Sequence, residues 1–347
     1  MIQLYVDVEK YVANIEKIKS TLKNGTKYCA VVKANAYGLG YKEISEATQN
    51  NVDCFAVAFS FEGLAMREEG IKKPILQLSP YESEYLQDSI NQEIMLSTFS
   101  LSQLEEIEKT AKSVGKSAVV QIKINSGMNR YGVKDSGYLN DMLNKINSSK
   151  NLSLAGVFSH LSGRDEEFAY VQKSNFEKLT NHINTHKHIS ASYGTRLSQD
   201  FHMNMVRVGI DAIGTGEDDY TKQTVALKSE IVAFQSVEAG EYIGYGDYFK
   251  ANEKINVAIV RGGYADGVNR LLRNGGCVII NGNACKVRGT ICMDCFMVDV
   301  SNADCKIGDS VEIFSENMPL ATYANTIQTI PYEAVTQISQ RVKRVYL

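Results

Sequence analysis

The stretch AVVKANAYG at residues 30–38 decides how the chain should fold. Its apolar first half predicts a buried strand, and Lys33 stands at the carboxyl end of that strand, directly before a polar turn that contains glycine. A lysine ammonium that is removed from water can release its proton, and the free amine can attack an aldehyde to form a Schiff base. A solvated lysine at the start of a loop is the alternative.

Further apolar runs follow this strand and alternate with helical or polar stretches. The runs cover residues 54–58, 74–79, 94–97, 118–124, 154–160, 189–193 and 206–213. Helical spacing of apolar residues recurs in residues 8–23, 61–69, 101–114 and 166–183. Alternation of strands with helices of this length is typical of right-handed βαβ units. Together with the Lys33 strand, the runs favour an α/β fold, a closed (β/α)8 barrel of the TIM type, with an open doubly wound sheet as the alternative.

The pattern changes after residue 222. Short strand-like runs occupy residues 225–234, 255–260, 277–280, 284–287, 295–300 and 310–314. Gly275-Gly276 and Asn281-Gly282-Asn283 lie between them at the spacing of hairpin turns. We therefore expect a barrel over residues 8–222, followed by a mainly antiparallel β domain over residues 223–347 that is joined by a strand at residues 1–7.

Composition narrows the classes of function. The 347 residues carry a formal net charge of -3 with lysines dispersed among acids, which gives no footprint for nucleic acid. No run of about 18 apolar residues and no signal-peptide pattern occurs, so we expect a cytoplasmic protein without a membrane segment. The seven cysteines are an odd, scattered set that favours reduced thiols. Cys292 and Cys295 have the spacing of a redox or zinc pair but no second pair, so we expect no metal site.

Several polar residues fall at or near the ends of the predicted barrel strands, where barrel enzymes have their active sites. These residues are Lys33, the GMNR run ending at Arg130, His160, Ser192, Arg207 and Gly209. Each has a plainer interpretation alone, such as a core histidine, an arginine paired with an acid or a serine that caps a helix. Together they match a phosphate-bearing aldehyde cofactor, which needs an amine, N–H and hydroxyl donors for the phosphate, and a partner for its ring nitrogen.

The stretch at residues 30–38 resembles the cofactor-lysine motif of the alanine racemase family. The resemblance recurs in IGYG at 243–246, GGYADG at 262–267 and IPYE at 330–333, and it covers nearly the whole chain. It implies pyridoxal 5'-phosphate as the cofactor. Lys33 would form the Schiff base, His160 would lie against the pyridine ring, and Arg207 would donate to its nitrogen. The phosphate would be held by Tyr37, Ser192, Gly209, Ile210 and Tyr332.

An arginine beside the pyridine nitrogen has a chemical consequence. A guanidinium stays protonated, so the ring is a weaker electron sink than it would be beside a carboxylate, and a carbanion should be reprotonated quickly. This suits racemisation, which needs a base on each face of the substrate. The resemblance implies Lys33 for one face and Tyr245 for the other, with Tyr245 supplied by the second subunit of a homodimer that shares its active sites.

The same resemblance implies how a small amino acid would be held. Arg130 and the backbone of Met293 would bind its carboxylate, while Tyr264 and Tyr332 would narrow the entrance. Lys123 matches a lysine that is often carbamylated in this family. The usual Asp-Thr pair beside it reads Asn125-Ser126 here.

Two more departures concern residues near the expected site. Leu39 stands where the family usually has histidine, outside the lysine and tyrosine positions. SASYG at residues 190–194 is closer to the serine and alanine racemase branch of glycopeptide resistance. Tyr332, in contrast, is the residue expected in alanine enzymes, and the membrane half of the resistance racemases has no counterpart here.

These observations predict a pyridoxal-phosphate-dependent alanine racemase that supplies D-alanine for peptidoglycan. A racemase with serine or broad specificity is the first alternative. A related amino-acid decarboxylase shares the expected fold but fits the tyrosine and arginine motifs less well. A pyridoxal-phosphate carrier protein has the lysine barrel without a β domain.

Overall fold

Eight parallel strands form the first of two sheets in the computed structural model, which describes residues 1–347. They are β2 (Lys27–Val31), β3 (Cys54–Val57), β4 (Ile75–Gln77), β5 (Ile94–Thr98), β6 (Ala118–Lys123), β7 (Leu152–Phe158), β8 (His186–His188) and β9 (Met205–Val208). The order is β8-β7-β6-β5-β4-β3-β2-β9. The Asn204 N–H donates to the Lys187 carbonyl (3.1 Å) and the Arg207 N–H to the Ser190 carbonyl (3.0 Å), which joins the two ends. The sheet is therefore a (β/α)8 barrel and not an open doubly wound sheet.

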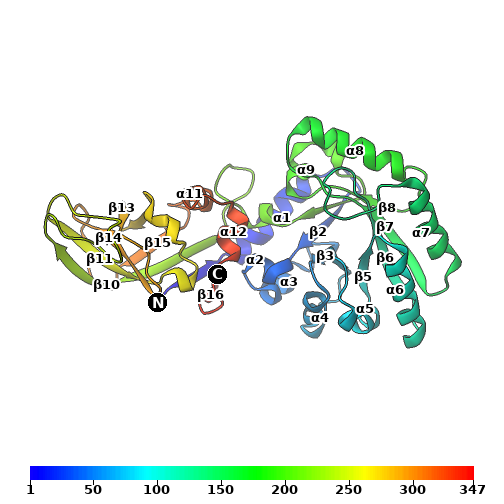
Figure 1. The fold of residues 1–347 in the computed structure, drawn as a ribbon, viewed down its shortest axis with the longest axis horizontal. Coiled ribbons are helices and arrows are strands. Elements are labelled where there is room, and N and C mark those ends of the chain that lie inside the picture. The colour runs from blue at the N-terminus through cyan, green and yellow to red at the C-terminus, as the bar shows by residue number, and fades with distance from the viewer. The chain divides into compact units, whose positions relative to one another are not determined.

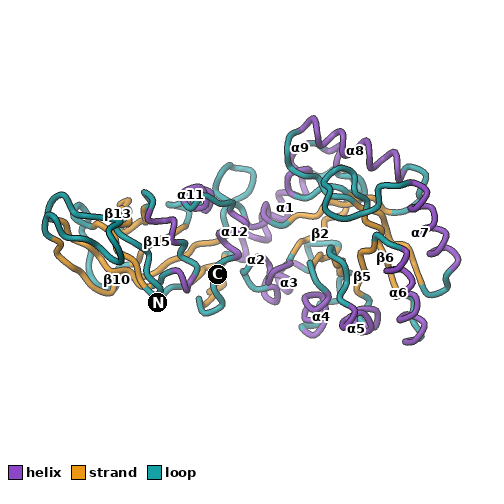
Figure 2. Tube along the Cα trace, viewed as in Figure 1, coloured by secondary structure: helices purple, strands orange, loops and turns teal.

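Helices follow the strands and cover the outside of this barrel (Figures 1 and 2). They are α3 (Tyr41–Thr48), α4 (Ser60–Glu68), α5 (Leu86–Asn91), α6 (Leu101–Val114), α7 (Ser136–Ser148), α8 (Glu166–Thr180) and α9 (Ser192–Leu197), with short 3-10 turns η1 (Ser83–Tyr85) and η2 (Gln199–Phe201). In the sequence, α1 (Val8–Thr21) precedes β2 and α10 (Ile210–Ile213) follows β9. In α6 the side chain of Ser100 caps the first turn, Gly115 ends the helix at φ 69°, and Leu104, Ile107 and Ala111 are buried. The predicted amphipathic pattern thus faces the barrel core.

The seventh strand differs from the prediction. Residues 189–193 were expected to be a strand, but β8 ends at His188 and α9 begins at Ser192. The Ser190 hydroxyl donates to the Phe201 carbonyl (2.7 Å), and the Ala191 carbonyl accepts from the Thr195 N–H (3.0 Å). The Ala191 bond is the first of the helical bonds of α9, so the chain leaves the strand conformation before Ser192. Likewise, the predicted eighth strand stops at Val208, and residues 210–213 form α10.

The turn after β2 is left-handed. In α2 (Lys33–Tyr37), Ala34, Asn35 and Ala36 have φ between 52° and 56°, and Tyr37 has φ 57°. Left-handed backbone costs an L-residue with a Cβ atom about 1–2 kcal/mol. Hydrogen bonds offset part of this cost: the Ala36 N–H donates to the Val32 carbonyl (2.8 Å), and the Ala34 N–H donates to the Glu62 carboxylate (2.5 Å). The chain after Lys33 is thus held in one unusual conformation.

Six antiparallel strands of the C-terminal part close into a second barrel. They are β10 (Val225–Val237), β11 (Ile255–Arg261), β12 (Cys277–Ile280), β13 (Asn283–Arg288), β14 (Cys295–Asp299) and β15 (Ser310–Phe314), and the ring closes because β10 pairs with both β11 and β15. β1 (Gln3–Val6) adds to β10 and pairs in parallel with β16 (Lys343–Tyr346). Short helices complete this part: η3 (Tyr264–Asp266), η4 (Arg270–Arg273), α11 (Leu320–Thr326) and α12 (Pro331–Thr336). The predicted β domain is confirmed as a fold.

The two predicted hairpin turns have different outcomes. Asn281 (φ 48°) and Gly282 (φ 79°) join β12 to β13 in a two-residue loop, as the Asn-Gly signal predicts. Gly275-Gly276 joins no two strands. The Gly276 N–H donates to the Leu272 carbonyl (2.9 Å), so this pair ends η4 instead.

The chain divides by its internal contacts into two compact units. Residues 16–36 and 41–209 form one, called here the barrel unit; residues 1–15, 37–40 and 210–347 form the other, called here the β unit. The predicted boundary between residues 222 and 223 stays a prediction. None of the helices combines the length and the apolar character needed to cross a bilayer.

Substitutions at Ala34 should reveal the strain in the left-handed turn. Ala34 is exposed and has φ 52°. Because glycine adopts this conformation freely, Ala34→Gly should raise the free energy of unfolding by up to about 1 kcal/mol. Ala34→Val should lower it by about 1–2 kcal/mol, since a β-branched side chain tolerates this backbone poorly. Denaturant unfolding monitored by circular dichroism measures both.

Ala13 provides the matched control, because it is exposed in the right-handed helix α1. Ala13→Gly should destabilise the protein by about 1 kcal/mol. A loss of stability in Ala34→Gly equal to that in Ala13→Gly would show that the turn is not left-handed.

Candidate active site

Cationic side chains gather at the carboxyl ends of the barrel-unit strands. Lys33 follows β2, Lys123 ends β6, Arg130 lies in the loop after β6, and Arg207 lies in β9. Burial and the nearby Arg130 lower the pKa of Lys33, against a smaller opposing effect of Glu62. The Lys33 amine therefore loses its proton more readily than a lysine in water.

Lys123 is buried without a counter-charge. Lys123 is 5% exposed, and no carboxylate is paired with its amine. Its Nζ instead lies 4.6 Å from the ring centre of Tyr131 and 5.0 Å from that of Phe158. Burial, followed by Arg207, Arg130 and Lys33, lowers its pKa to about 7. Near neutrality this amine is therefore partly unprotonated and nucleophilic.

Arg207 is fixed by neighbours that are all acceptors. The residue is 2% exposed, and its Nη2 donates to the carbonyls of Ser159 (2.7 Å) and Ile189 (3.1 Å). The same nitrogen lies 3.5 Å from Nδ1 of His160, while Nη1 donates to Nδ1 of His188. Burial lowers the pKa of Arg207 to about 10, so the guanidinium remains charged at neutral pH.

His188 orients Arg207 through a hydrogen bond, and Gln121 in turn orients His188. Since an arginine only donates, Nδ1 of His188 must be the acceptor, and its protonated Nε2 then donates to the Gln121 side-chain oxygen (2.7 Å). Burial and Arg207 lower the pKa of His188 and of His160 well below the usual range, so both rings are neutral. Phe158 stacks on His188 at 5.0 Å. Sequence reasoning missed His188 and Gln121. Gln121 gave a signal as a polar residue inside the predicted strand 118–124, whereas His188 lies just before the predicted run 189–193 and gave none.

The loop that carries Arg130 is shaped by Asn125. The Asn125 side-chain oxygen accepts from the N–H groups of Gly127 (3.2 Å) and Asn129 (3.0 Å). An aspartate would offer the same acceptor, so the Asn125 departure preserves the turn while removing one negative charge. The Ser126 hydroxyl bonds that of Ser159 (2.7 Å). Arg130 itself is exposed, with its guanidinium 5.2 Å from the ring centre of Tyr131.

The residues predicted to hold phosphate lie in several places. Ser192 is buried at the start of α9, Gly209 follows β9, and Ile210 is buried at the start of α10, where the chain passes from the barrel unit to the β unit. Tyr37 and Tyr332 both belong to the β unit, with ring centres 6.2 Å apart and planes at 58°. Burial, followed by Tyr332, raises the pKa of Tyr37, so its phenol stays protonated and can donate.

Tyr245 and Met293 line one cavity of about 560 Å³ on the β unit. They are 72% and 52% exposed. Gly244 and Gly246, with φ of 74° and 70°, flank Tyr245, and a Cβ at Gly244 would lie 2.7 Å from the Met297 side chain. The glycines are therefore required by the loop that presents this phenol.

Tyr264 is attached to the segment that carries Met293. The Tyr264 N–H donates to the Cys292 carbonyl (3.0 Å), and the Ala265 N–H donates to the Met293 carbonyl (3.1 Å). Arg341 bridges the carboxylates of Asp266 (2.7 Å) and Asp294 (2.6 Å), which joins the same two loops. The Cys292 N–H bonds the Cys295 carbonyl (2.9 Å), and all seven cysteines are free thiols.

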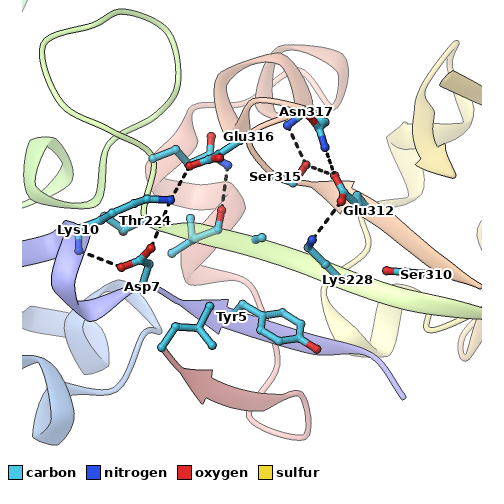
Figure 3. A pocket seen from close by; sticks show the side chains of 14 residues that line it. Tyr5, Asp7, Lys10, Thr224, Lys228, Ser310, Glu312, Ser315, Glu316 and Asn317 are labelled. Atoms are coloured by element: carbon cyan, nitrogen blue, oxygen red, sulfur yellow. Dashed lines mark hydrogen bonds and ion pairs between the residues drawn. The ribbon is translucent and has the colours of Figure 1, made fainter. Parts of the chain in front are cut away.

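A further groove of about 500 Å³ on the β unit has its charges already paired (Figure 3). Lys10 binds Glu316 (2.6 Å) and Asp7 (3.2 Å), and Lys228 binds Glu312 (3.0 Å). The charged side chains Asp7, Lys10, Lys228, Glu312 and Glu316 are thus paired with one another. The groove is not a candidate active site.

The structure thus brings the predicted residues together in three groups. Lys33, Lys123, Arg130, His160 and Arg207 share the strand ends of the barrel unit, Tyr37 contacts Tyr332, and Tyr245, Met293 and Tyr264 lie on connected loops. A parallel barrel with a buried amine and a fixed arginine at its strand ends, followed by an antiparallel β barrel, defines a class of enzyme with two domains.

Comparisons with known proteins identify the family. Residues 6–216 match the family model of the alanine racemase N-terminal domain, and residues 224–346 match that of the C-terminal domain. The chain is 32% identical to alanine racemase 1 of Oceanobacillus iheyensis, covering 99% of this chain and 97% of the relative. It is 31% identical to the alanine racemase of Methanococcus maripaludis, covering 99% and 97%.

Solved structures agree. The alanine racemase of Clostridium difficile 630 is 33% identical, with a TM-score of 0.93 over 100% of this chain and 95% of that one. The alanine racemase from E. faecalis is 27% identical, with a TM-score of 0.92 over 100% and 98%. The chain belongs to the alanine racemase family.

Replacing Lys123 by methionine should stabilise the cofactor-free protein in a pH-dependent way. The folded-state pKa of about 7 lies below the ordinary 10.5, so the folded chain binds fewer protons between these values and wild-type stability rises with pH across that window. Lys123→Met lacks this titration. In bicarbonate-free buffer it should be more stable than wild type by about 1–3 kcal/mol at pH 6, with the advantage shrinking toward pH 10.

Denaturant unfolding of both proteins across this pH range measures the difference. Lys145→Met is the control, because this partly exposed lysine is paired with Glu108 (2.6 Å); it should not be more stable than wild type at pH 6. A Lys123→Met advantage that stays constant with pH would show that Lys123 keeps its ordinary pKa.

Proposed function

We propose that this chain is a pyridoxal-phosphate-dependent alanine racemase that interconverts L- and D-alanine. The observation that carries the proposal is the half-buried Lys33, whose lowered pKa favours a free amine, in a chain that matches both domain models of this family. Lys123, Arg130 and Arg207 add three cations to Lys33 in this site, and neither Lys123 nor Arg207 is paired with a carboxylate, which suits a ligand that carries negative charge.

The residues present fit pyridoxal phosphate. Lys33 would hold the aldehyde carbon, and the Nε–H of Arg207, which makes no hydrogen bond within the chain, would be available to the pyridine nitrogen. Tyr37, Ser192, Gly209, Ile210 and Tyr332 would hold the phosphate, and His160 would lie against the ring. When bound, the cofactor delocalises the electron pair that remains when the substrate loses its α-proton.

The chain's own groups would move the protons. Lys33 would take or return a proton on one face, because its lowered pKa favours the neutral amine. Arg207 stays charged and held by His188, so it donates without accepting a proton from its surroundings. A charged donor at this position would leave a bound pyridine ring a weak electron sink and would favour return of the proton to the same carbon.

Tyr245 would serve the opposite face as a partner subunit's residue. Its phenol is 72% exposed on the β unit, in the same cavity as Met293, so a second surface is needed to enclose it. We propose a head-to-tail homodimer in which each subunit lends Tyr245 and Met293 to the other's active site. Arg130 and the Met293 backbone would bind the substrate carboxylate.

We assign different roles to the two predicted domains. Residues 8–222 would bind the cofactor, and residues 223–347 with strand 1–7 would supply the partner's tyrosine. Tyr264 and Tyr332, 44% and 39% exposed, would limit the size of the substrate side chain. Serine is the alternative substrate; faster turnover of serine than of alanine would contradict the alanine assignment.

We further propose that Lys123 reacts with carbon dioxide to form a carbamate near Arg130. Support comes from its lowered pKa, since only the neutral amine reacts, and from its lack of an acidic partner. Added bicarbonate should then stabilise wild type but leave Lys123→Met unchanged. An equal response of both proteins would contradict carbamylation.

The cellular role we propose is supply of D-alanine for peptidoglycan in the cytoplasm. The seven unpaired cysteines support a reducing compartment.

Activity and cofactor attachment test the main assignment. The purified protein with pyridoxal phosphate should racemise alanine in both directions, and borohydride reduction followed by peptide mapping should place the cofactor on Lys33. Tyr245→Phe should reduce racemisation by at least about 100-fold because one face loses its base. Tyr248→Phe is the control, since this exposed tyrosine lies three residues away. Unchanged racemisation rates in Tyr245→Phe would contradict the two-base assignment.

Mixed dimers test the shared active site. Lys33→Ala and Tyr245→Phe should each be inactive alone, but in a mixed dimer one of the two sites contains both intact residues. Dissociation and reassociation of an equal mixture should therefore restore about one quarter of wild-type activity. No recovery, despite mixed dimers detected by mass spectrometry, would mean that Tyr245 acts within its own chain.

A further inference from the structure

We propose that Arg344 is a positioning residue that fixes Tyr37 relative to Tyr332. The inference rests on the proposed function, in which these two tyrosines hold the cofactor phosphate. Arg344 itself would touch neither cofactor nor substrate. All residues involved belong to the β unit.

The guanidinium of Arg344 donates to four backbone carbonyls. Its Nε bonds Gly38 (2.9 Å) and its Nη2 bonds Ile338 (2.8 Å). Its Nη1 bonds both Ser339 (2.6 Å) and Val342 (2.7 Å). A single side chain therefore connects segments that are about 300 residues apart in the sequence.

These carbonyls flank the two tyrosines. Gly38 directly follows Tyr37, while Ile338 and Ser339 follow α12, the helix that carries Tyr332. The contact is close: a Cβ at Gly38 would lie 3.2 Å from the Val335 carbonyl within α12. The Tyr346 hydroxyl adds a second tie, donating to the Leu39 carbonyl (2.8 Å). Strand β16 therefore holds the Tyr37 segment against the Tyr332 helix.

Arginine is needed because of its shape. Arg344 forms no ion pair, and burial lowers its pKa, so its charge is stabilised by carbonyl dipoles rather than by an acid. A planar guanidinium offers donors in fixed directions to several carbonyls at once. A lysine carries its donors on one nitrogen and lacks the planar fork that distributes bonds over Gly38, Ile338, Ser339 and Val342.

The placement of the Tyr37 and Tyr332 rings then depends on the hydrogen bonds of Arg344. Tyr37 ends the left-handed turn with φ 57°, and Tyr332 lies in the short helix α12 (Pro331–Thr336). Their ring centres are 6.2 Å apart. Without Arg344, the carbonyl of Gly38 and those that follow α12 lose their common donor, and the Tyr346–Leu39 bond does not replace the link to α12.

A double-mutant cycle on cofactor affinity tests the inference. Binding of pyridoxal phosphate to the cofactor-free protein is titrated by fluorescence for wild type, Arg344→Gln, the double variant Tyr37→Phe/Tyr332→Phe, and the triple variant. Arg344→Gln should raise the dissociation constant about 10-fold in the wild-type background. In the double-variant background it should raise it by less than about 3-fold, because the hydroxyls it positions are absent.

Two further variants keep the test measurable. Arg344→Lys retains the charge and should fold, yet should recover little of the affinity. Lys343→Gln, next to Arg344 and exposed, is the matched control and should bind like wild type. Thermal unfolding of each protein confirms that titrations are made on folded chains.

Each alternative outcome overturns a defined part of the proposal. An equal effect of Arg344→Gln in both backgrounds would show that Arg344 only stabilises the fold, and would overturn the positioning role alone. Wild-type affinity in the double tyrosine variant would overturn the phosphate assignment, and the inference with it.

Discussion

Burial of positive charge without acidic partners at the barrel strand ends is the constraint on which the site depends. Arg207 is held only by carbonyls and by neutral His188, and Lys123 lies between two aromatic rings. Each group is costly to bury, and the cost lowers the pKa of Lys33 and Lys123. The same cost makes an anionic ligand favourable. The burial of these cations therefore both costs folding free energy and produces the lowered lysine pKa values on which the proposed chemistry depends.

The β unit presents its polar groups by backbone hydrogen bonds. The Tyr264 loop is fixed to Cys292 and Met293 through main-chain bonds, and glycines with positive φ flank Tyr245. Arg344 uses the same principle, since its partners are all carbonyls. Main-chain attachment fixes position while leaving the side chains free to meet a ligand or a second subunit. Tyr245 is accordingly exposed on a loop whose backbone is constrained by its two glycines.

Sequence reasoning located the elements well where local signals were strong. The ends of α6, the strands β12 and β15 and the Asn281-Gly282 turn were predicted from periodicity and turn chemistry. It was wrong for residues 189–193, where α9 begins at Ser192 and the Ser190 hydroxyl donates to the carbonyl of Phe201, a residue later in the chain. His188 and Gln121 were missed because their role depends on meeting Arg207 across the barrel interior. The left-handed turn was missed because two alanines carry no signal for it.

The sequence by itself determined the two fold classes and the family, because apolar periodicity and motif spacing are local properties of the chain. It also placed Lys33, Arg207 and Tyr245 at the ends of strands or in turns. Only the tertiary structure decided the electrostatics and the hydrogen-bond partners of the buried cations. It shows that Lys123 has no carboxylate partner, that Arg207 donates to His188, and that Arg344 joins Gly38 to the end of α12. Burial, orientation and charge balance arise from residues far apart in the chain, so they exist only once the chain has folded.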